Sequence, residues 1–146
     1  MAITIREPNT IHLAGSYELI NTHAAIETLT PGMILELHND SGVPKWGVHD
    51  SADDNVAAFI ALEQDELNKT ISDTYAAGDL VKVAHMKPGC VFLGIIPSGQ
   101  NLAVGALLQS NGDGKLKAIG SGKAKFMALE ASGAVTADTR LRVEVL

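Results

Sequence analysis

The feature that most constrains the fold is a motif that occurs twice. The segments "AAFIALE" (residues 57–63) and "AKFMALE" (residues 124–130) share the pattern A-x-F-x-A-L-E. Each follows a glycine, an apolar run, an Asn/Asp/Gly turn and a lysine, in "PGMILELHNDSGVPK" and "VGALLQSNGDGKLK". Internal repeats are sought first because they determine the whole architecture. We therefore predict two related units of a hairpin followed by one more strand, over residues 30–63 and 103–130.

The alternative is that a β-rich domain reuses similar turns and strands without duplication. If the two units are related, Phe59 and Phe126 occupy equivalent and largely buried positions. The residues Ala, Leu and Glu in the motif favour helix. The second copy, however, reaches "ASG" only a few residues after its phenylalanine, which is too short for a stable helix. We predict that both copies are strands and that residues 64–75 hold a turn of helix or an excursion loop.

Glycines mark the starts of several predicted strands. A glycine stands just before an apolar run in "TPGMILEL", "AAGDLVKV", "KPGCVFLG" and "AVGALLQS". Glycine tolerates a positive φ and so suits the turn that leads into a strand. The segments "HNDSG" (residues 38–42) and "NGDG" (residues 111–114) are hairpin-turn signals. In "TRLRVEVL", the apolar residues Leu141, Val143 and Val145 alternate with charged ones, which indicates a half-buried strand.

These signals predict a mainly β fold. We expect a small β-barrel or β-sandwich built from the two related hairpin-plus-strand halves. The duplicated unit is expected to close the sheet and to leave few free edges for strand-to-strand aggregation.

The first part of the chain differs from the rest. Residues 1–29 show no sustained period, and Pro8 interrupts the short alternating run at the start. We predict an extended N-terminal arm, residues 1–29, followed by a single β-rich domain, residues 30–146. An arm with this much apolar surface needs a surface to lie on. That surface belongs either to a partner or to the arm's own domain.

Composition excludes several classes of protein. The 146 residues suggest one domain, with 46% apolar and 19% charged residues. The net charge is −6 and basic residues do not cluster, which argues against nucleic-acid binding. Cys90 is the one cysteine, so an internal disulfide is impossible, and its apolar surroundings suggest a buried, inert thiol. We find neither a secretory signal nor a run of about 18 apolar residues, so no membrane association is expected.

Catalytic and metal-binding patterns are also weak. The five histidines include no pair at metal-ligand spacing on one predicted element. The segment "DSADDN" lacks the glycine and glutamate of a calcium loop, and "GSGK" lacks the spacing of a phosphate-binding loop. Glu63 and Glu130 are equivalent in the two units and could be considered as an acid–base pair, but flanking a strand end is the simpler interpretation. We predict no enzyme, no cofactor and no metal.

Three motifs are the most specific in the sequence: "TPGMILEL", "DTYAAGDLV" and "GALLQSNGDGKLK". Together with the "KPG" turn, "AKFMALEA" and the final "TRLRVEVL", they occur in an order that resembles the capsid decoration, or cement, proteins of tailed bacteriophages. The resemblance extends from Ala24 to Leu146. All these motifs are structural, so the resemblance transfers no catalytic residue and does not identify capsid contacts.

The resemblance implies a structural virion protein, made in the host bacterial cytoplasm, that binds the outer surface of the capsid. It would stabilise the shell by bridging neighbouring subunits of the major capsid protein, and we expect a homotrimer. We expect the arm to be mobile in the free protein and ordered on the capsid. Its candidate contact residues are Ile3, Ile5, Ile11, Leu13 and Tyr17.

Two other functions stay open at this point. The chain could be a tail or baseplate structural domain with a similar small barrel. It could also be a small-ligand-binding module or small enzyme, which a pocket lined by Glu63, Glu130 and a histidine would support.

Overall fold

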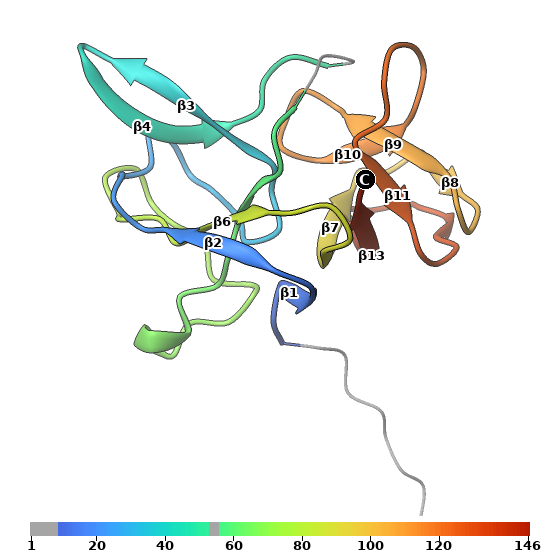
Figure 1. Ribbon diagram of the computed structural model, residues 1–146, viewed down its shortest axis with the longest axis horizontal. Helices are drawn as coiled ribbons and strands as arrows, with labels where there is room; N and C mark the ends of the chain where they lie inside the picture. Colours follow the sequence, from blue (N-terminus) through green and yellow to red (C-terminus); the bar gives the residue numbers. More distant parts are fainter. Residues whose placement is uncertain (1–8, 53–55) are drawn as a thin grey trace, which may run out of the picture.

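The structure, a computed structural model, describes residues 9–52 and 56–146, which form thirteen strands and one short 3-10 helix (Figure 1). The 3-10 helix η1 lies within residues 64–75, where a turn of helix was expected. Within the described residues, no helix is long and apolar enough to span a membrane. The elements are β1 (His12–Ala14), β2 (Tyr17–Ile20), β3 (Leu35–Asp40), β4 (Val43–Val48), β5 (Phe59–Ala61), η1 (Asp65–Leu67), β6 (Val83–Met86), β7 (Val91–Ile96), β8 (Asn101–Leu102), β9 (Leu107–Ser110), β10 (Leu116–Ala118), β11 (Phe126–Ala128), β12 (Gly133–Ala134) and β13 (Thr139–Val145).

The strands form several antiparallel sheets, as a mainly β fold predicts. The largest has the order β1-β7-β13-β11-β9-β10, and a three-stranded sheet has the order β2-β6-β5. The pairs β3-β4 and β8-β12 complete the set. The large sheet is not closed into a barrel, because β1 and β10 are two separate edges. The expected closure of the sheet is therefore wrong. β5 and β6 of the first half form a separate sheet with β2 and join neither edge of the large sheet.

The first predicted unit forms a hairpin followed by one strand. β3 and β4 are joined by a tight turn at Ser41 and Gly42, whose φ angles of 51° and 88° are both positive, as in the favoured two-residue hairpin turn. β5 then returns beside the start of the hairpin. The Gly32 amide donates to the Ala61 carbonyl at 2.7 Å, and the Ala61 amide donates to the Met33 carbonyl at 3.0 Å.

The second unit has the same arrangement. β9 and β10 form the hairpin, and β11 returns beside its start. The Gly105 amide donates to the Ala128 carbonyl at 2.8 Å, and the Ala128 amide donates to the Ala106 carbonyl at 2.9 Å. On its other side the returning strand pairs antiparallel with β6 in the first half and with β13 in the second. The two segments therefore share one hairpin-plus-strand arrangement.

The four predicted glycine turns have one geometry. In each, the glycine has a φ between 84° and 96°, and the residue after it donates its amide to the carbonyl three residues earlier. This is the pattern of a type II turn, whose third residue needs a positive φ. The donor and acceptor pairs are Met33 and Thr30, Asp79 and Ala76, Cys90 and Lys87, and Ala106 and Ala103, at 3.0–3.1 Å.

Strand β13 is at the centre of the main core. It lies between β7 and β11, and the predicted alternation is confirmed, since Leu141, Val143 and Val145 are all buried. Their cluster includes Phe92 and Phe126, whose rings meet edge to face at 5.7 Å. A second, smaller cluster belongs to the first half and is built around Trp46.

The two equivalent phenylalanines differ in burial. Phe126 is fully buried, because β11 has a strand on each side. Phe59 is only half-buried, although β5 is also flanked by β6 and by the start of the β3-β4 hairpin. The Phe59 ring lies between Trp46, at 5.1 Å, and the exposed His85, at 4.4 Å. The prediction of equivalent positions is confirmed, and that of deep burial holds for Phe126 alone.

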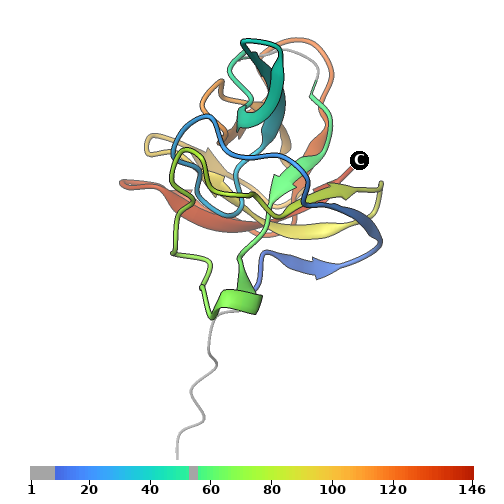
Figure 2. The ribbon, with the colours of Figure 1, turned by 90° about the vertical axis from the view of Figure 1, so that its left-hand side faces the viewer.

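The N-terminal segment packs on its own domain from Asn9 onward. β1 pairs with β7 of the large sheet, and β2 pairs with β6 (Figure 2). The Ile11 side chain is fully buried in the main core, and the Leu93 amide donates to the Ile11 carbonyl at 2.9 Å. Residues 9–29 are therefore not a separate arm, because apolar side chains and strand pairing fix them to the domain. Ile3 and Ile5 lie outside the described residues.

The position of Ile11 predicts a large loss of stability on truncation. Ile11→Ala should lower the free energy of unfolding by about 2–5 kcal/mol, because it leaves a cavity in the main core. Urea unfolding of the purified protein measures this. The control Leu67→Ala, whose side chain is 65% exposed, should change stability by about 0.5 kcal/mol or less. A small effect of Ile11→Ala would restore the interpretation of this segment as a detached arm.

The two phenylalanines should respond unequally to truncation. Phe126→Ala should cost about 3–5 kcal/mol of unfolding free energy, as expected for a fully buried ring. Phe59→Ala should cost clearly less, because water already reaches part of its ring. Equal losses in parallel urea titrations would contradict the structural difference between β5 and β11.

Candidate functional site

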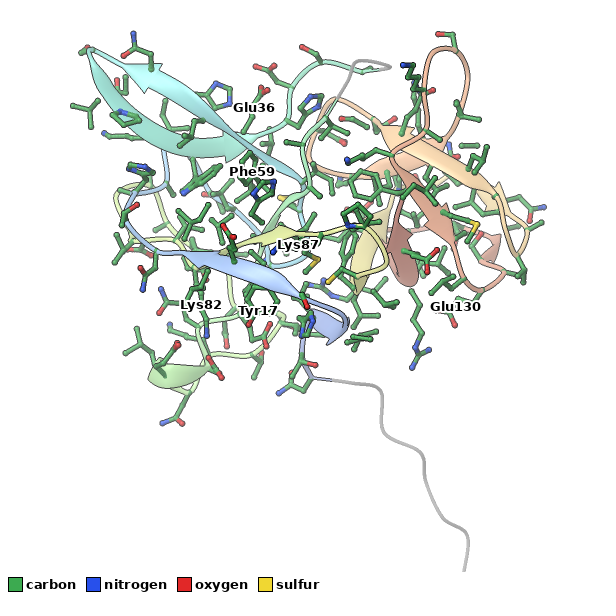
Figure 3. The ribbon with its side chains drawn as sticks, viewed as in Figure 1. Tyr17, Glu36, Phe59, Lys82, Lys87 and Glu130 are labelled. Atoms are coloured by element: carbon green, nitrogen blue, oxygen red, sulfur yellow. The ribbon has the colours of Figure 1, made fainter. Side chains whose placement is uncertain are left out.

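The described arm residues have structural positions. Ile11 belongs to the core, and Leu13 and Tyr17 are half-buried against it. The Tyr17 ring, labelled on β2 in Figure 3, meets the His12 ring edge-on at 4.6 Å. Ile11 is therefore not available as a contact for a partner, and Leu13 and Tyr17 offer only part of their surface.

Glu63 and Glu130 have separate structural roles. Glu63 is buried, and its Oε2 accepts a hydrogen bond from the Ile11 amide at 3.0 Å. Glu130 accepts a hydrogen bond from the Arg142 amide at 3.0 Å and forms an ion pair with its guanidinium at 3.3 Å. Each glutamate lies two residues after the end of a strand, β5 or β11, and binds a backbone amide, in agreement with the simpler of the two interpretations.

Cys90 is a buried free thiol, as the sequence predicts. Its Sγ donates to the Ala14 carbonyl at 3.0 Å. Burial raises the pKa of the thiol, which keeps it protonated and unreactive at neutral pH.

A cavity of about 440 Å³ lies beside η1. Its wall includes Tyr75, whose hydroxyl donates to the Leu62 carbonyl at 2.5 Å. Burial raises the pKa of Tyr75 to about 12, so the phenol is neutral and cannot act as a base near pH 7. Neither Glu63, Glu130 nor a histidine lines this cavity, so it does not match the pocket that a ligand-binding module or enzyme was expected to have.

Lys82 anchors η1 near the same cavity. Its ammonium contacts the carboxylates of Asp65 at 2.8 Å and Glu66 at 2.7 Å. Partial burial disfavours the charged form of Lys82, but these hydrogen bonds outweigh it and raise the lysine pKa above its usual range. The same contact lowers the pKa of Asp65. Because both carboxylates are exposed, we assign the pair to local loop structure.

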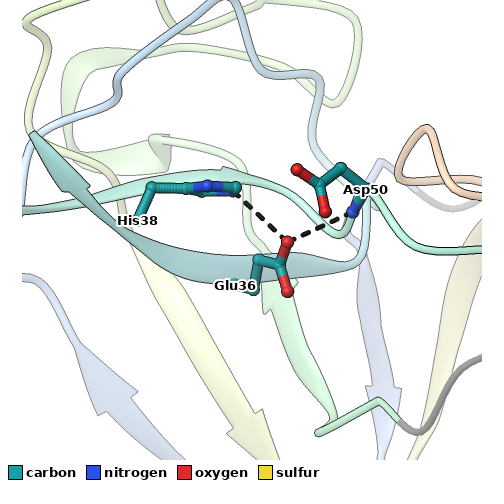
Figure 4. Close-up of side chains that lie close together, drawn as sticks. All are labelled: Glu36, His38 and Asp50. Carbon is teal, nitrogen blue, oxygen red and sulfur yellow. Dashed lines mark hydrogen bonds and ion pairs between the residues drawn. The ribbon is translucent and has the colours of Figure 1, made fainter.

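The structure brings together a group of polar side chains at the base of the β3-β4 hairpin. Glu36 and His38 are two residues apart on β3, so their side chains point to the same face. The distance from His38 Nε2 to Glu36 Oε1 is 3.5 Å, and the Asp50 amide donates to the same oxygen at 3.2 Å (Figure 4). One ligand atom from each of the three residues lies within 4.8 Å of the others.

A buried histidine connects this cluster to the second half of the molecule. His49 Nδ1 is 2.7 Å from the Ser110 hydroxyl, and His49 Nε2 is 3.9 Å from Glu36 Oε2. The order serine–histidine–carboxylate is that of a hydrolase triad. Ser110 is fully buried, however, and its hydroxyl accepts the Gly112 amide at 3.1 Å. Since Ser110 is out of reach of a substrate, we interpret the chain of contacts as a structural connection between β9 and the β3-β4 hairpin.

This cluster has no signature of closely spaced cysteines and histidines in the sequence. It combines carboxylates and imidazoles from β3 and from the residues just after β4. The i, i+2 spacing of Glu36 and His38 on a predicted strand was the available signal. The approach of residues 49–50 to Glu36 depends on the register in which β3 and β4 pair.

Exposed apolar side chains occur over several elements. Two of them, Leu37 and Val43, lie on the β3-β4 hairpin, which projects from the upper left of the molecule in Figure 1. Among the residues that the structure describes, the exposed large apolar ones are Leu19, Leu37, Val43, Leu67, Leu80, Val104, Leu107 and Leu146.

These observations define the chain as a mainly β domain whose polar clusters mostly secure its own backbone. No protein-family model and no curated protein matches the chain. Among solved structures, it is similar to the N base of head fiber gp8.5 of bacteriophage phi29, with a TM-score of 0.60 at 13% sequence identity. The match covers 90% of this chain and 95% of that one. At this identity the likeness shows a shared fold.

The buried link between the halves can be tested by substitution. Ser110→Ala should cost about 1–3 kcal/mol of unfolding free energy, because it removes the hydroxyl that the buried His49 contacts. Urea unfolding measures the loss. The matched control is Ser51→Ala, an exposed serine for which little change is expected. If both variants were as stable as the unchanged protein, the His49–Ser110 contact would contribute nothing.

Proposed function

We propose that this chain is a structural protein of a bacteriophage virion that binds the outer surface of the capsid. The observation that carries the proposal is the shared fold with the base of a phage head fiber, over nine-tenths of the chain. The motif order described above independently resembles phage capsid decoration proteins. Two different lines of comparison thus support the same class of protein.

The internal contacts of the acidic residues agree with a structural role. Glu63 and Glu130 would be the first candidates for acid–base chemistry, but their oxygens are engaged with backbone amides. Such bonds stabilise loops and strand ends. We therefore propose that the protein is not an enzyme.

The proposed partner is the major capsid protein, and the proposed effect is to bridge its neighbouring subunits. A homotrimer would suit this role, because capsid lattices contain local three-fold positions where three identical surfaces meet. Of the five predicted contact residues, Ile3 and Ile5 remain the best candidates, since Ile11 belongs to the core. Deleting residues 2–8 removes both isoleucines and ends before Ile11 and β1.

Electron microscopy of purified particles tests the location. Particles of the phage that encodes the chain should show added density on the head surface, and particles lacking the protein should lose it. Density on the tail or baseplate instead would support the alternative structural role and contradict capsid binding.

A binding assay with purified heads tests the contact residues. The variant lacking residues 2–8 should keep the melting temperature of the full chain and should cosediment with heads several-fold less, because Ile3 and Ile5 are absent. The control Leu67→Ser changes an exposed apolar residue away from the N-terminus and should bind normally. Undiminished cosedimentation of the deletion variant would place the contact in the loops or hairpins of the β-domain.

A further inference from the structure

We propose that Glu36, His38 and Asp50 bind a divalent metal ion of the zinc class at the base of the β3-β4 hairpin. The group combines an imidazole with two carboxylates, which are ligand types that zinc accepts. Ligands at about 2.1 Å from a tetrahedral zinc ion are about 3.4 Å apart. The 3.5 Å between His38 Nε2 and Glu36 Oε1 matches this spacing. The third ligand lies within 4.8 Å and belongs to an exposed residue, so a small side-chain rotation completes the set.

Gly47 lets the His38 ring approach the backbone of β4. Gly47 is opposite Glu36 in the β3-β4 register, and its φ lies outside the positive range that favours glycine. A Cβ at this position would lie 2.8 Å from His38 Nε2 and 2.9 Å from Glu27 Oε2. The absence of a side chain at Gly47 therefore lets the His38 ring and the Glu27 carboxylate pack directly against the β4 backbone. This close approach brings a third carboxylate near His38.

The charge around the site also favours a cation. Three carboxylates, from Glu27, Glu36 and Asp50, border His38. Among the described residues, Glu36 lies within ion-pair distance of two imidazoles, those of His38 and His49. Lys45, the lysine opposite His38 on β4, is paired with Asp40 at 2.7 Å, toward the hairpin tip. A divalent ion would reduce the repulsion among the three carboxylates.

The buried histidine has a positioning role in this proposal. His49 Nε2 is 3.9 Å from the second oxygen of Glu36, and Ser110 contacts its Nδ1. Such a contact orients a ligating carboxylate without binding the metal itself. Removing the contacting side chain typically weakens metal affinity about 10–100-fold.

Metal binding requires one rearrangement. His38 Nε2 is 3.1 Å from the Val48 carbonyl, so in the absence of metal this nitrogen carries the proton and donates it. For Nε2 to coordinate the metal, the single proton of the neutral imidazole moves to Nδ1, and Nε2 gives up its hydrogen bond to the Val48 carbonyl. The Asp50 amide can keep its bond to Glu36, because a carboxylate oxygen accepts more than one contact.

The ligand set distinguishes zinc-class ions from calcium and magnesium. Imidazole favours zinc and its transition-metal neighbours, whereas calcium and magnesium prefer sites made of oxygen atoms alone. A bound ion would join β3 to the segment just after β4. It would stabilise the projecting hairpin whether or not the protein binds a capsid, so the inference is independent of the proposed function.

The test is a titration of the tag-free full chain with zinc chloride, followed by isothermal calorimetry and thermal unfolding. One equivalent should bind and should raise the melting temperature, with little response to magnesium or calcium. Glu36→Gln and His38→Gln should each weaken zinc binding at least about tenfold. Gly47→Ala should do the same, because its Cβ would displace the His38 ring or the Glu27 carboxylate.

The matched control is His85→Gln, the same substitution at an exposed histidine on β6. It should bind zinc as the unchanged chain does. Melting curves without zinc verify that each variant is folded. The proposal is overturned if the unchanged chain binds no zinc, if folded Glu36→Gln and His38→Gln variants bind it normally, or if His85→Gln loses as much affinity as they do.

Discussion

The pairing of β13 with β7 on one side and β11 on the other is the interaction on which the rest of the structure depends. β13 is the last strand of the chain, yet it lies inside the six-stranded sheet. Its three buried residues complete the core to which Phe92, Phe126 and Ile11 contribute. Through β11 it holds the second hairpin, and through β7 it holds β1. Strands from both ends of the chain are thereby fixed to one core.

The two halves show how one local design gives different results in different surroundings. In both, a type II glycine turn leads into a hairpin, and a short strand returns to pair with its start. The second copy lies within the large sheet, and its phenylalanine is completely buried. The first copy lies at the edge of a smaller sheet, beside Trp46. Local hydrogen bonding is the same in the two copies, and the side chains packed around each phenylalanine decide its burial.

The parts of the fold that sequence could predict are those determined by local chemistry. Positive-φ turns at Gly32 and Gly105, the alternation in β13 and the short strands of the repeated motif all follow from nearby residues. The position of Ile11 could not be predicted in this way, because it depends on pairing with β7, some eighty positions later. The same limitation applies to the candidate metal site. Its strand spacing is visible in the sequence, but the approach of Asp50 to Glu36 and of His38 to Gly47 depends on the hairpin register.

The single tryptophan has a practical consequence for spectroscopy. Trp46 is the one tryptophan in the chain, and it is buried in the smaller cluster of the first half, next to Phe59. The larger cluster contains phenylalanines but no tryptophan among its described members. Intrinsic fluorescence excited at the red edge of absorption therefore reports on the first half, while far-ultraviolet circular dichroism reports on all sheets. Comparing the two signals shows whether the two clusters lose their structure together or one after the other.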